Sequence, residues 1–189
     1  MRTEAPPHTF LFADLVGFTA LTDAEGDDHA AAVAIEFQHR ARELASRHGA
    51  EAVKALGDAV MLRCPEAAGG IRLGLGLVEE LAADPTLPPI RVGVHSGSAV
   101  ARDGDWFGHG VNVASRLCSV AGGGEVLVSE AAWEAAGELP AIELGERRLH
   151  WLKNVTEPVP ARLASIRERR RGRRRWCPHS GNSMRARVA

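Results

Sequence analysis

Two acidic residues stand out because each lies among apolar neighbours, where a carboxylate is costly. Asp14 interrupts the apolar run FLFADLV at residues 10–16, and Asp58 lies between the runs VKAL and AVML. An ionised carboxylate in such a setting needs a cation, a metal ion or dense hydrogen bonding to compensate it. Brought together, the two aspartates would offer the hard oxygen ligands that Mg²⁺ and Mn²⁺ prefer. The alternative is that Asp14 caps a turn and Asp58 is only a hairpin residue.

A second candidate pair, Asn112 and Arg116, lies in the segment GVNVASRL. Residues four positions apart share one face of a helix. An amide can bond a ribose oxygen, and a guanidinium offers several donors to the oxygens of a phosphate. The alternative is an exposed polar helix face without a ligand.

The third pair, Lys54 and Asp105, has the polarity of a site for adenine. Adenine presents an acceptor at ring N1 and a donor at its exocyclic amine, and a lysine and a carboxylate complement that edge. Guanine presents the opposite polarity. The alternative is a surface lysine and an unrelated loop aspartate, since spacing in the sequence does not join them.

Apolar periodicity and turn signals predict the elements that would hold these residues. Helices are expected from residue 30 to the break at Gly49 and at 65–83, 110–120 and 130–136, with loops at 23–28 and 103–109. Strands are expected at 9–16, 51–56, 59–63, 90–95, 99–102, 125–129, 142–151 and 158–166. Gly57-Asp58 would turn a hairpin, and segment 99–102 would pair with 90–95. The predicted class is α+β, with a ferredoxin-like βαβ core and helices on one side of a mainly antiparallel sheet.

The composition predicts a globular domain at residues 1–166 followed by an arginine-rich tail at 167–189. The chain has 189 residues, 45% of them hydrophobic and 25% charged, which is ordinary for a globular protein. The tail holds nine arginines and one acidic residue, a charge of +8, so with −1 overall the first 166 residues carry −9. No apolar run is long enough for a membrane span or a signal peptide. The cysteines Cys64, Cys118 and Cys177 are widely spaced and fit reduced thiols, so a cytoplasmic location is expected.

Six stretches together resemble the class III nucleotidyl cyclases, the adenylate and guanylate cyclase catalytic domain. They occur in order between about residues 9 and 165, and they are FADLVGFT, VKALGDAVM, RVGVHSG, DWFGHGVNVASRL, GEVLVSE and LKNVTEPV. The resemblance implies an adenylate cyclase that converts ATP into 3′,5′-cyclic AMP and pyrophosphate. It also implies a homodimer with two shared active sites, in which one copy gives the aspartates and the other gives the remaining residues.

By position, the resemblance assigns metal ligands and nucleobase contacts. Two divalent ions, Mg²⁺ or Mn²⁺, would be held by Asp14, Asp58 and the backbone carbonyl of Leu15. The adenine-selecting pair would be Lys54 and Asp105.

The same resemblance assigns the remaining catalytic and phosphate-binding positions. Asn112 and Arg116 match the transition-state pair of the family's N-x-A-x-R helix. Lys153 would bind the triphosphate, although Trp151 nearby departs from the small residue usual there.

Three other functions stay open at this point. The chain could be a guanylate cyclase or a nucleotide-binding regulatory module of the same fold. It could also be a nucleic-acid-binding protein that acts through its tail, because arginine clusters attract the phosphates of nucleic acid or of anionic lipid. The tail itself is expected to be disordered.

Overall fold

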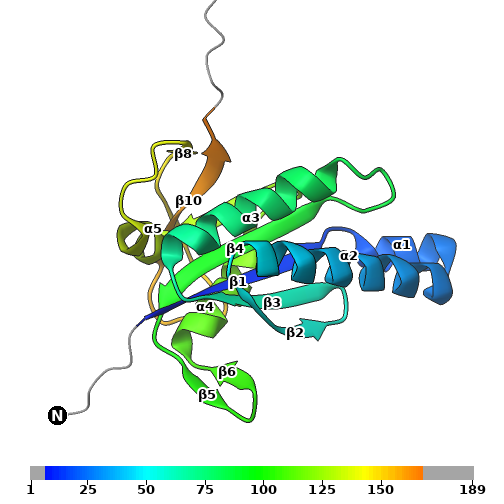
Figure 1. Cartoon of the computed structure of the whole chain (residues 1–189), viewed down its shortest axis with the longest axis horizontal. Helices are drawn as coiled ribbons and strands as arrows, with labels where there is room; N and C mark the ends of the chain where they lie inside the picture. The colour runs from blue at the N-terminus through cyan, green and yellow to red at the C-terminus, as the bar shows by residue number, and fades with distance from the viewer. Residues whose placement is uncertain (1–6, 168–189) are drawn as a thin grey trace, which may run out of the picture.

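Strand β1 (His8–Leu15) is an interior strand of the main sheet. It pairs antiparallel with β3 (Ala59–Cys64) on one side and with β4 (Ile90–Gly97) on the other. Its residues from Phe10 to Ala13 are almost completely buried. The computed structural model describes residues 7–167, and Figure 1 shows their arrangement.

The main sheet has the strand order β2-β3-β1-β4-β7-β10-β8, with β9 also paired to β10. The remaining strands are β2 (Glu51–Leu56), β7 (Val126–Ser129), β8 (Ile142–Leu144), β9 (Arg148–His150) and β10 (Val159–Ile166). Only β4 and β7 pair in parallel among the described strands, and α4 (His109–Val120) lies between them in the chain as the helix of a βαβ unit. The sheet is therefore mainly antiparallel and the class is α+β, as predicted.

Helices cover both faces of this sheet. Figure 1 shows α2 (Asp27–Arg47) and α3 (Ala67–Ala82) side by side on one face. Leu11 and Ala13 belong to the core on that face, whereas Phe10 and Phe12 pack in a second core with residues of α4. The prediction that helices lie on one side is therefore wrong. A strand that is apolar at consecutive positions, as β1 is from Phe10 to Ala13, needs cover on both of its faces.

Helix α4 lies unusually close to the sheet because β4 has no side chain at Gly93. A Cβ atom built there would lie 2.2 Å from the backbone nitrogen of Cys118 and 2.6 Å from the carbonyl oxygen of Ala114. Real Cβ atoms do not approach other atoms so closely. Gly93 thus fixes the distance between α4 and the strand beneath it.

Residues 23–28, expected to be a loop, are mostly helical. Helix α1 (Phe18–Glu25) begins after Gly17, which takes a left-handed conformation with φ of 82°, and α2 follows after Gly26. Phe18 and Leu21 are partly buried against the core. The mostly polar run DAEGDD at residues 23–28 indicated a loop, so the helical spacing of Phe18 and Leu21 just before it was not recognised in the sequence.

The segment 99–109 also differs from the prediction. Strand β5 (Val100–Arg102) pairs with β6 (Asp105–Phe107) in a separate two-stranded sheet, not with β4. Asp103 and Gly104 both have positive φ, 50° and 77°, which is the requirement of a tight two-residue hairpin turn. Figure 1 shows the hairpin projecting from the main sheet.

The predicted strand over 142–151 is divided into β8 and β9, which both pair with β10. Helix α5 (Glu130–Ala136) has the predicted bounds. None of the helices between residues 7 and 167 is long and apolar enough to cross a membrane. Of the predicted tail only Arg167 is described, and its Nε donates to Glu143 at 2.9 Å, while residues 168–189 lie outside the described part of the chain.

Candidate active site

Asp14 and Asp58 lie at the same corner of the sheet. Asp14 stands near the end of β1, and Asp58 is in the turn between β2 and β3. The N–H of Leu15 donates to the carbonyl oxygen of Asp58 at 3.3 Å, which holds the turn against the end of β1. Burial, together with the negative charge of Asp14, raises the pKa of the Asp58 carboxyl. The fold therefore brings together two carboxylates that are 44 positions apart in the printed sequence.

A guanidinium compensates one of these carboxylates. Arg91 stands opposite Asp14 in the β1–β4 register, and its Nε donates to Asp14 Oδ2 at 2.8 Å while its Nη2 contacts the same oxygen. Its Nη1 also donates to the carbonyl oxygen of Ser119 at the end of α4, at 3.2 Å. The sequence reasoning gave Arg91 no role. The sequence does show that Arg91 is a cation within the predicted strand 90–95. Its partner, however, depends on the register between strands, which the sequence does not show.

The carboxylate pair has the donor chemistry of a divalent-cation site. Both Arg91 contacts fall on Oδ2 of Asp14, so Oδ1 makes no hydrogen bond with another described residue. A cation would offset the burial, and the repulsion by Asp14, that raise the pKa of Asp58. Between residues 7 and 167, no group of three or more His, Cys, Asp or Glu side chains is arranged to hold a metal. The two carboxylates therefore fit an ion whose other ligands come from backbone, water or substrate.

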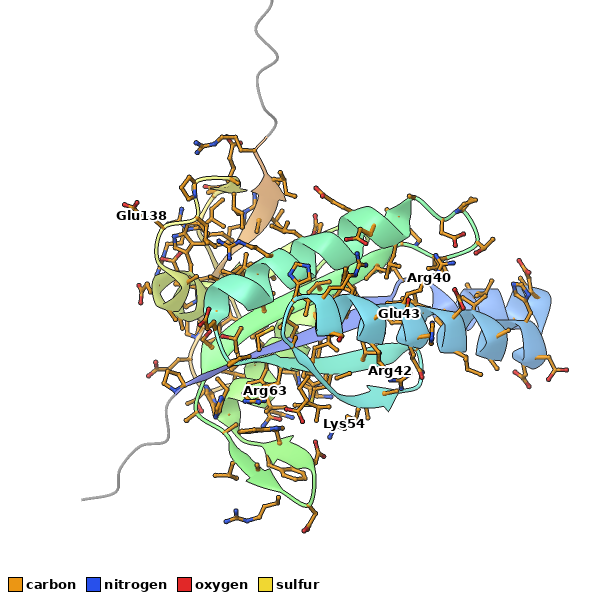
Figure 2. All side chains as sticks on the ribbon, viewed as in Figure 1. Arg40, Arg42, Glu43, Lys54, Arg63 and Glu138 are labelled. Atoms are coloured by element: carbon orange, nitrogen blue, oxygen red, sulfur yellow. The ribbon has the colours of Figure 1, made fainter. Side chains whose placement is uncertain are left out.

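Lys54 and Asp105 are in direct contact although they lie far apart in the sequence. Lys54 Nζ is 2.6 Å from Asp105 Oδ2, and Asp105 Oδ1 accepts the N–H of Trp106 at 2.7 Å. The hydrogen bond from Lys54, and then that from Trp106, lower the pKa of the Asp105 carboxyl. Figure 2 shows Lys54 at the β2 edge of the sheet, beside the β5–β6 hairpin. Both side chains are about one-third or less exposed, with 33% for Lys54 and 26% for Asp105.

The pair on α4 faces outward. Val113 and Leu117 pack into a core cluster with Leu127 and Leu152, which leaves Asn112 exposed and Arg116 half-buried. Neither polar side chain forms a hydrogen bond or ion pair with another residue in the part of the chain that the structure describes. Arg116 thus presents a guanidinium that is not neutralised within the described fold.

Lys153 lies in a turn between β9 and β10, and its side chain is exposed. The preceding residue, Leu152, packs against Val113 and Leu117 of α4. The fold therefore holds the Lys153 turn against the helix that carries Asn112 and Arg116. Leu15, whose carbonyl was assigned to the metal site, follows Asp14 at the end of β1.

The comparison with known families gives one match that spans most of the chain. The family described as "Adenylate and Guanylate cyclase catalytic domain" matches residues 3–148. A pH-sensitive adenylate cyclase of Mycobacterium tuberculosis is 42% identical over 165 residues, 84% of this chain and 41% of that protein. An adenylate cyclase of Streptomyces coelicolor is 41% identical over 120 residues, 64% of this chain and 32% of that protein. The chain thus spans well under half the length of these relatives.

Solved structures agree on the fold. The adenylyl cyclase CyaB from P. aeruginosa superposes with a TM-score of 0.73 over 88% of this chain and 97% of that chain, at 22% sequence identity. The α+β class and the family resemblance inferred from the sequence are both confirmed. The chain belongs to the adenylate and guanylate cyclase catalytic domain family.

Proposed function

We propose that this protein is an adenylate cyclase that converts ATP into 3′,5′-cyclic AMP and pyrophosphate. The observation that carries the choice of ATP is the contact between Lys54 and Asp105 at 2.6 Å. A lysine donor beside a carboxylate acceptor complements the adenine edge and opposes that of guanine. The relatives from M. tuberculosis and S. coelicolor, which are named adenylate cyclases, support this choice.

In the proposed reaction, the ribose 3′-oxygen forms a bond to the α-phosphorus as the bond from that phosphorus to the pyrophosphate oxygen breaks. The proton of the 3′-hydroxyl passes to solvent. Asp14, Asp58 and the carbonyl oxygen of Leu15 would hold two ions of Mg²⁺ or Mn²⁺. Such ions, when bound, lower the pKa of the attacking hydroxyl and neutralise charge on the triphosphate.

The remaining residues bind and orient the nucleotide. Arg116 has no neutralising partner among the described residues, so its guanidinium is available for the charge that develops on the α-phosphoryl group. Asn112, one helical turn earlier on the same face, would hold the ribose in line for attack. Lys153, exposed in the turn packed on α4, would bind the outer phosphates.

The two sets of residues are proposed to meet between two copies of the chain. Within one copy, Arg116 forms no ion pair with Asp14 or Asp58, and Asp14 is instead paired with Arg91. A head-to-tail homodimer would place Arg116 of one copy at the carboxylates of the other and create two equivalent sites. Cys64 and Cys118 are free and buried, which supports a reducing, cytoplasmic setting.

The direct test is to incubate the purified protein with ATP or GTP, with Mg²⁺ or Mn²⁺, and to identify the products by mass spectrometry. We expect cyclic AMP and pyrophosphate in equal amounts from ATP, and loss of both products in Asp14→Ala. Preferential formation of cyclic GMP would instead assign a guanylate cyclase. Absence of any cyclic nucleotide would contradict the proposal.

A further inference from the structure

The β5–β6 hairpin has no strand pairing to the main sheet within the described residues. A two-stranded hairpin by itself is marginally stable in water. Asp105, the first residue of β6, nevertheless contacts Lys54 of β2 at 2.6 Å. Side-chain contacts must therefore determine where Asp105 lies.

Trp106 provides the principal contact between the hairpin and the sheet. Its ring lies 4.5 Å from the ring of His8 and 5.7 Å from that of Phe10, between ring centroids. The Arg63 guanidinium lies 4.8 Å from the centre of the same ring. Aromatic pairs and guanidinium–ring contacts at these distances are attractive. Trp106 also packs against the core cluster between the sheet and α4.

The residues that hold Trp106 are themselves fixed to the sheet. Arg63 donates to Glu51 at 2.9 Å through its Nε, and its Nη1 lies 3.2 Å from Nδ1 of His8. His8 and Phe10 belong to β1, Arg63 to β3 and Glu51 to β2. Figure 2 shows Arg63 on the side of the sheet from which the hairpin projects. Strands β1 and β3 thus provide the side chains that contact the indole ring, and Glu51 of β2 holds Arg63 in place.

The backbone of Trp106 also orients the carboxylate of Asp105. Its N–H donates to Oδ1 at 2.7 Å, which turns Oδ2 toward Lys54. A shift of the indole would move this N–H and the adjacent carboxylate together, since the two residues are consecutive. The centre of the Phe107 ring also lies 5.7 Å from Nζ of Lys54.

We propose that Trp106, held by His8, Phe10 and Arg63, is the positioning residue that sets the nucleobase selectivity of this protein by placing Asp105 against Lys54. We refer to these four residues as the Trp106 clamp. The inference rests on the proposed function, because it assigns the clamp to the recognition of adenine. Trp106 acts through Asp105 and need not touch the nucleotide.

The test compares Trp106→Ala with a matched control, Trp133→Ala. Trp133 is also partly buried, but it packs against the opposite core from α5. We expect Trp106→Ala to lower the ratio of kcat/KM for ATP to that for GTP by about tenfold, mainly through a higher KM for ATP. Trp133→Ala should leave the ratio unchanged, and Trp106→Phe should keep most of it because a smaller ring still fills the clamp. The ratio is independent of the fraction of protein that is active.

Arg63→Met supplies a second variant in case Trp106→Ala does not fold. It removes the guanidinium from the indole face but keeps an unbranched side chain, and it should lower the same ratio. An unchanged ratio in a folded Arg63→Met or Trp106→Ala protein would overturn the proposal.

A measurement that needs no catalysis separates this inference from the proposed function. The pKa of the Asp105 carboxyl, followed by ¹³C NMR, should rise toward its ordinary value in Trp106→Ala, because the hydrogen bond to Lys54 is loosened. It should stay low in Trp133→Ala. If the wild-type protein makes no cyclic nucleotide, the proposed function fails, yet the clamp is still tested by this titration. An Asp105 pKa that does not change in Trp106→Ala would contradict the clamp whatever the activity.

Discussion

At the scale of residues, Asp14 and Asp58 are chemically alike but differently compensated. Arg91 lies against Asp14, whereas the Asp58 carboxylate has no ion pair among the described residues. Burial and the charge of Asp14 raise the pKa of Asp58, so the folded protein binds this proton more tightly than the unfolded chain does. The resulting stabilisation is present below the unfolded pKa and is lost as the pH rises through the folded pKa. At neutral pH, the ionised Asp58 carboxylate therefore opposes folding.

Burial of the Asp58 carboxylate and its repulsion by Asp14 together predict that Asp58→Asn stabilises the metal-free protein. The gain should be less than about 1 kcal/mol, because solvent screens the pair, and it should disappear as the pH falls below the ordinary aspartate pKa. The same variant should lose at least about 100-fold of cyclase activity, because it weakens the cation site.

Urea unfolding in the presence of a chelator, at neutral and acidic pH, measures this stability. Asp23→Asn, which removes an exposed carboxylate in α1, serves as the control and should change neither quantity. A metal-free Asp58→Asn protein that is less stable than the wild type at neutral pH would show that the ionised Asp58 carboxylate does not oppose folding.

The contact between Lys54 and Asp105 predicts an exchange of substrate preference. Lys54→Glu combined with Asp105→Gly reverses the polarity presented to the base, so use of ATP should fall and GTP should become the better substrate. The change in the ratio of kcat/KM values should exceed about tenfold, since a mismatched site leaves buried polar groups unpaired. Steady-state kinetics with both nucleotides measure the ratio, and an unchanged preference for ATP would exclude this pair from base selection.

At the scale of elements, the sequence predicts best where one signal is strong and local. The β2–β3 hairpin follows from Gly57-Asp58 between two apolar runs, and the helix expected at 130–136 is α5, which the structure caps with Ser129, whose hydroxyl accepts the N–H of Ala132. The β5–β6 hairpin was missed although Asp103-Gly104 is an equally good turn signal. Its strands have three residues each, too few to show an alternating pattern.

The candidate site was chosen from the sequence as a set of residues, and their arrangement in space was not predictable. The chemistry of Asp14, Asp58, Lys54 and Asp105 indicated two carboxylates for a cation and a donor–acceptor pair for a base. Nothing local in the sequence indicates that Arg91 lies opposite Asp14, because that depends on the β1–β4 register. The Trp106 clamp was missed for the same reason, since its members come from three separate segments.

Helix α4 provides a prediction at this scale. Gly93→Ala should destabilise the protein by about 1–3 kcal/mol, because its Cβ would overlap the α4 backbone at Cys118 and force the helix outward. The same shift would displace Asn112 and Arg116, so activity should fall even in the folded fraction. Gly69→Ala in α3 is the control: its nearest neighbour would be 3.8 Å away, and the helix should gain up to about 1 kcal/mol.

Thermal and urea unfolding measure both glycine variants. A Gly93→Ala protein as stable and active as the wild type would mean that α4 has room to move. That result would also contradict the conclusion that Gly93 fixes the distance between α4 and the sheet.

At the scale of the whole molecule, the proposed site consists of two groups of residues that do not meet within the described part of one copy. The carboxylates lie at the corner formed by β1 and the β2–β3 turn, and the free guanidinium of Arg116 lies on the outer face of α4. No ion pair joins them within the described part of one chain. If two copies complete each other, a defect in one half can be supplied by the partner.

The most direct measurement mixes Asp14→Ala chains with Arg116→Ala chains, each inactive alone. In a head-to-tail dimer of one chain of each kind, one site carries both substitutions and the other site carries neither. Random mixing of equal amounts should therefore restore about a quarter of the wild-type cyclase activity. Mixed dimers whose formation is verified by mass spectrometry, but which make no cyclic AMP, would contradict a site shared between two copies.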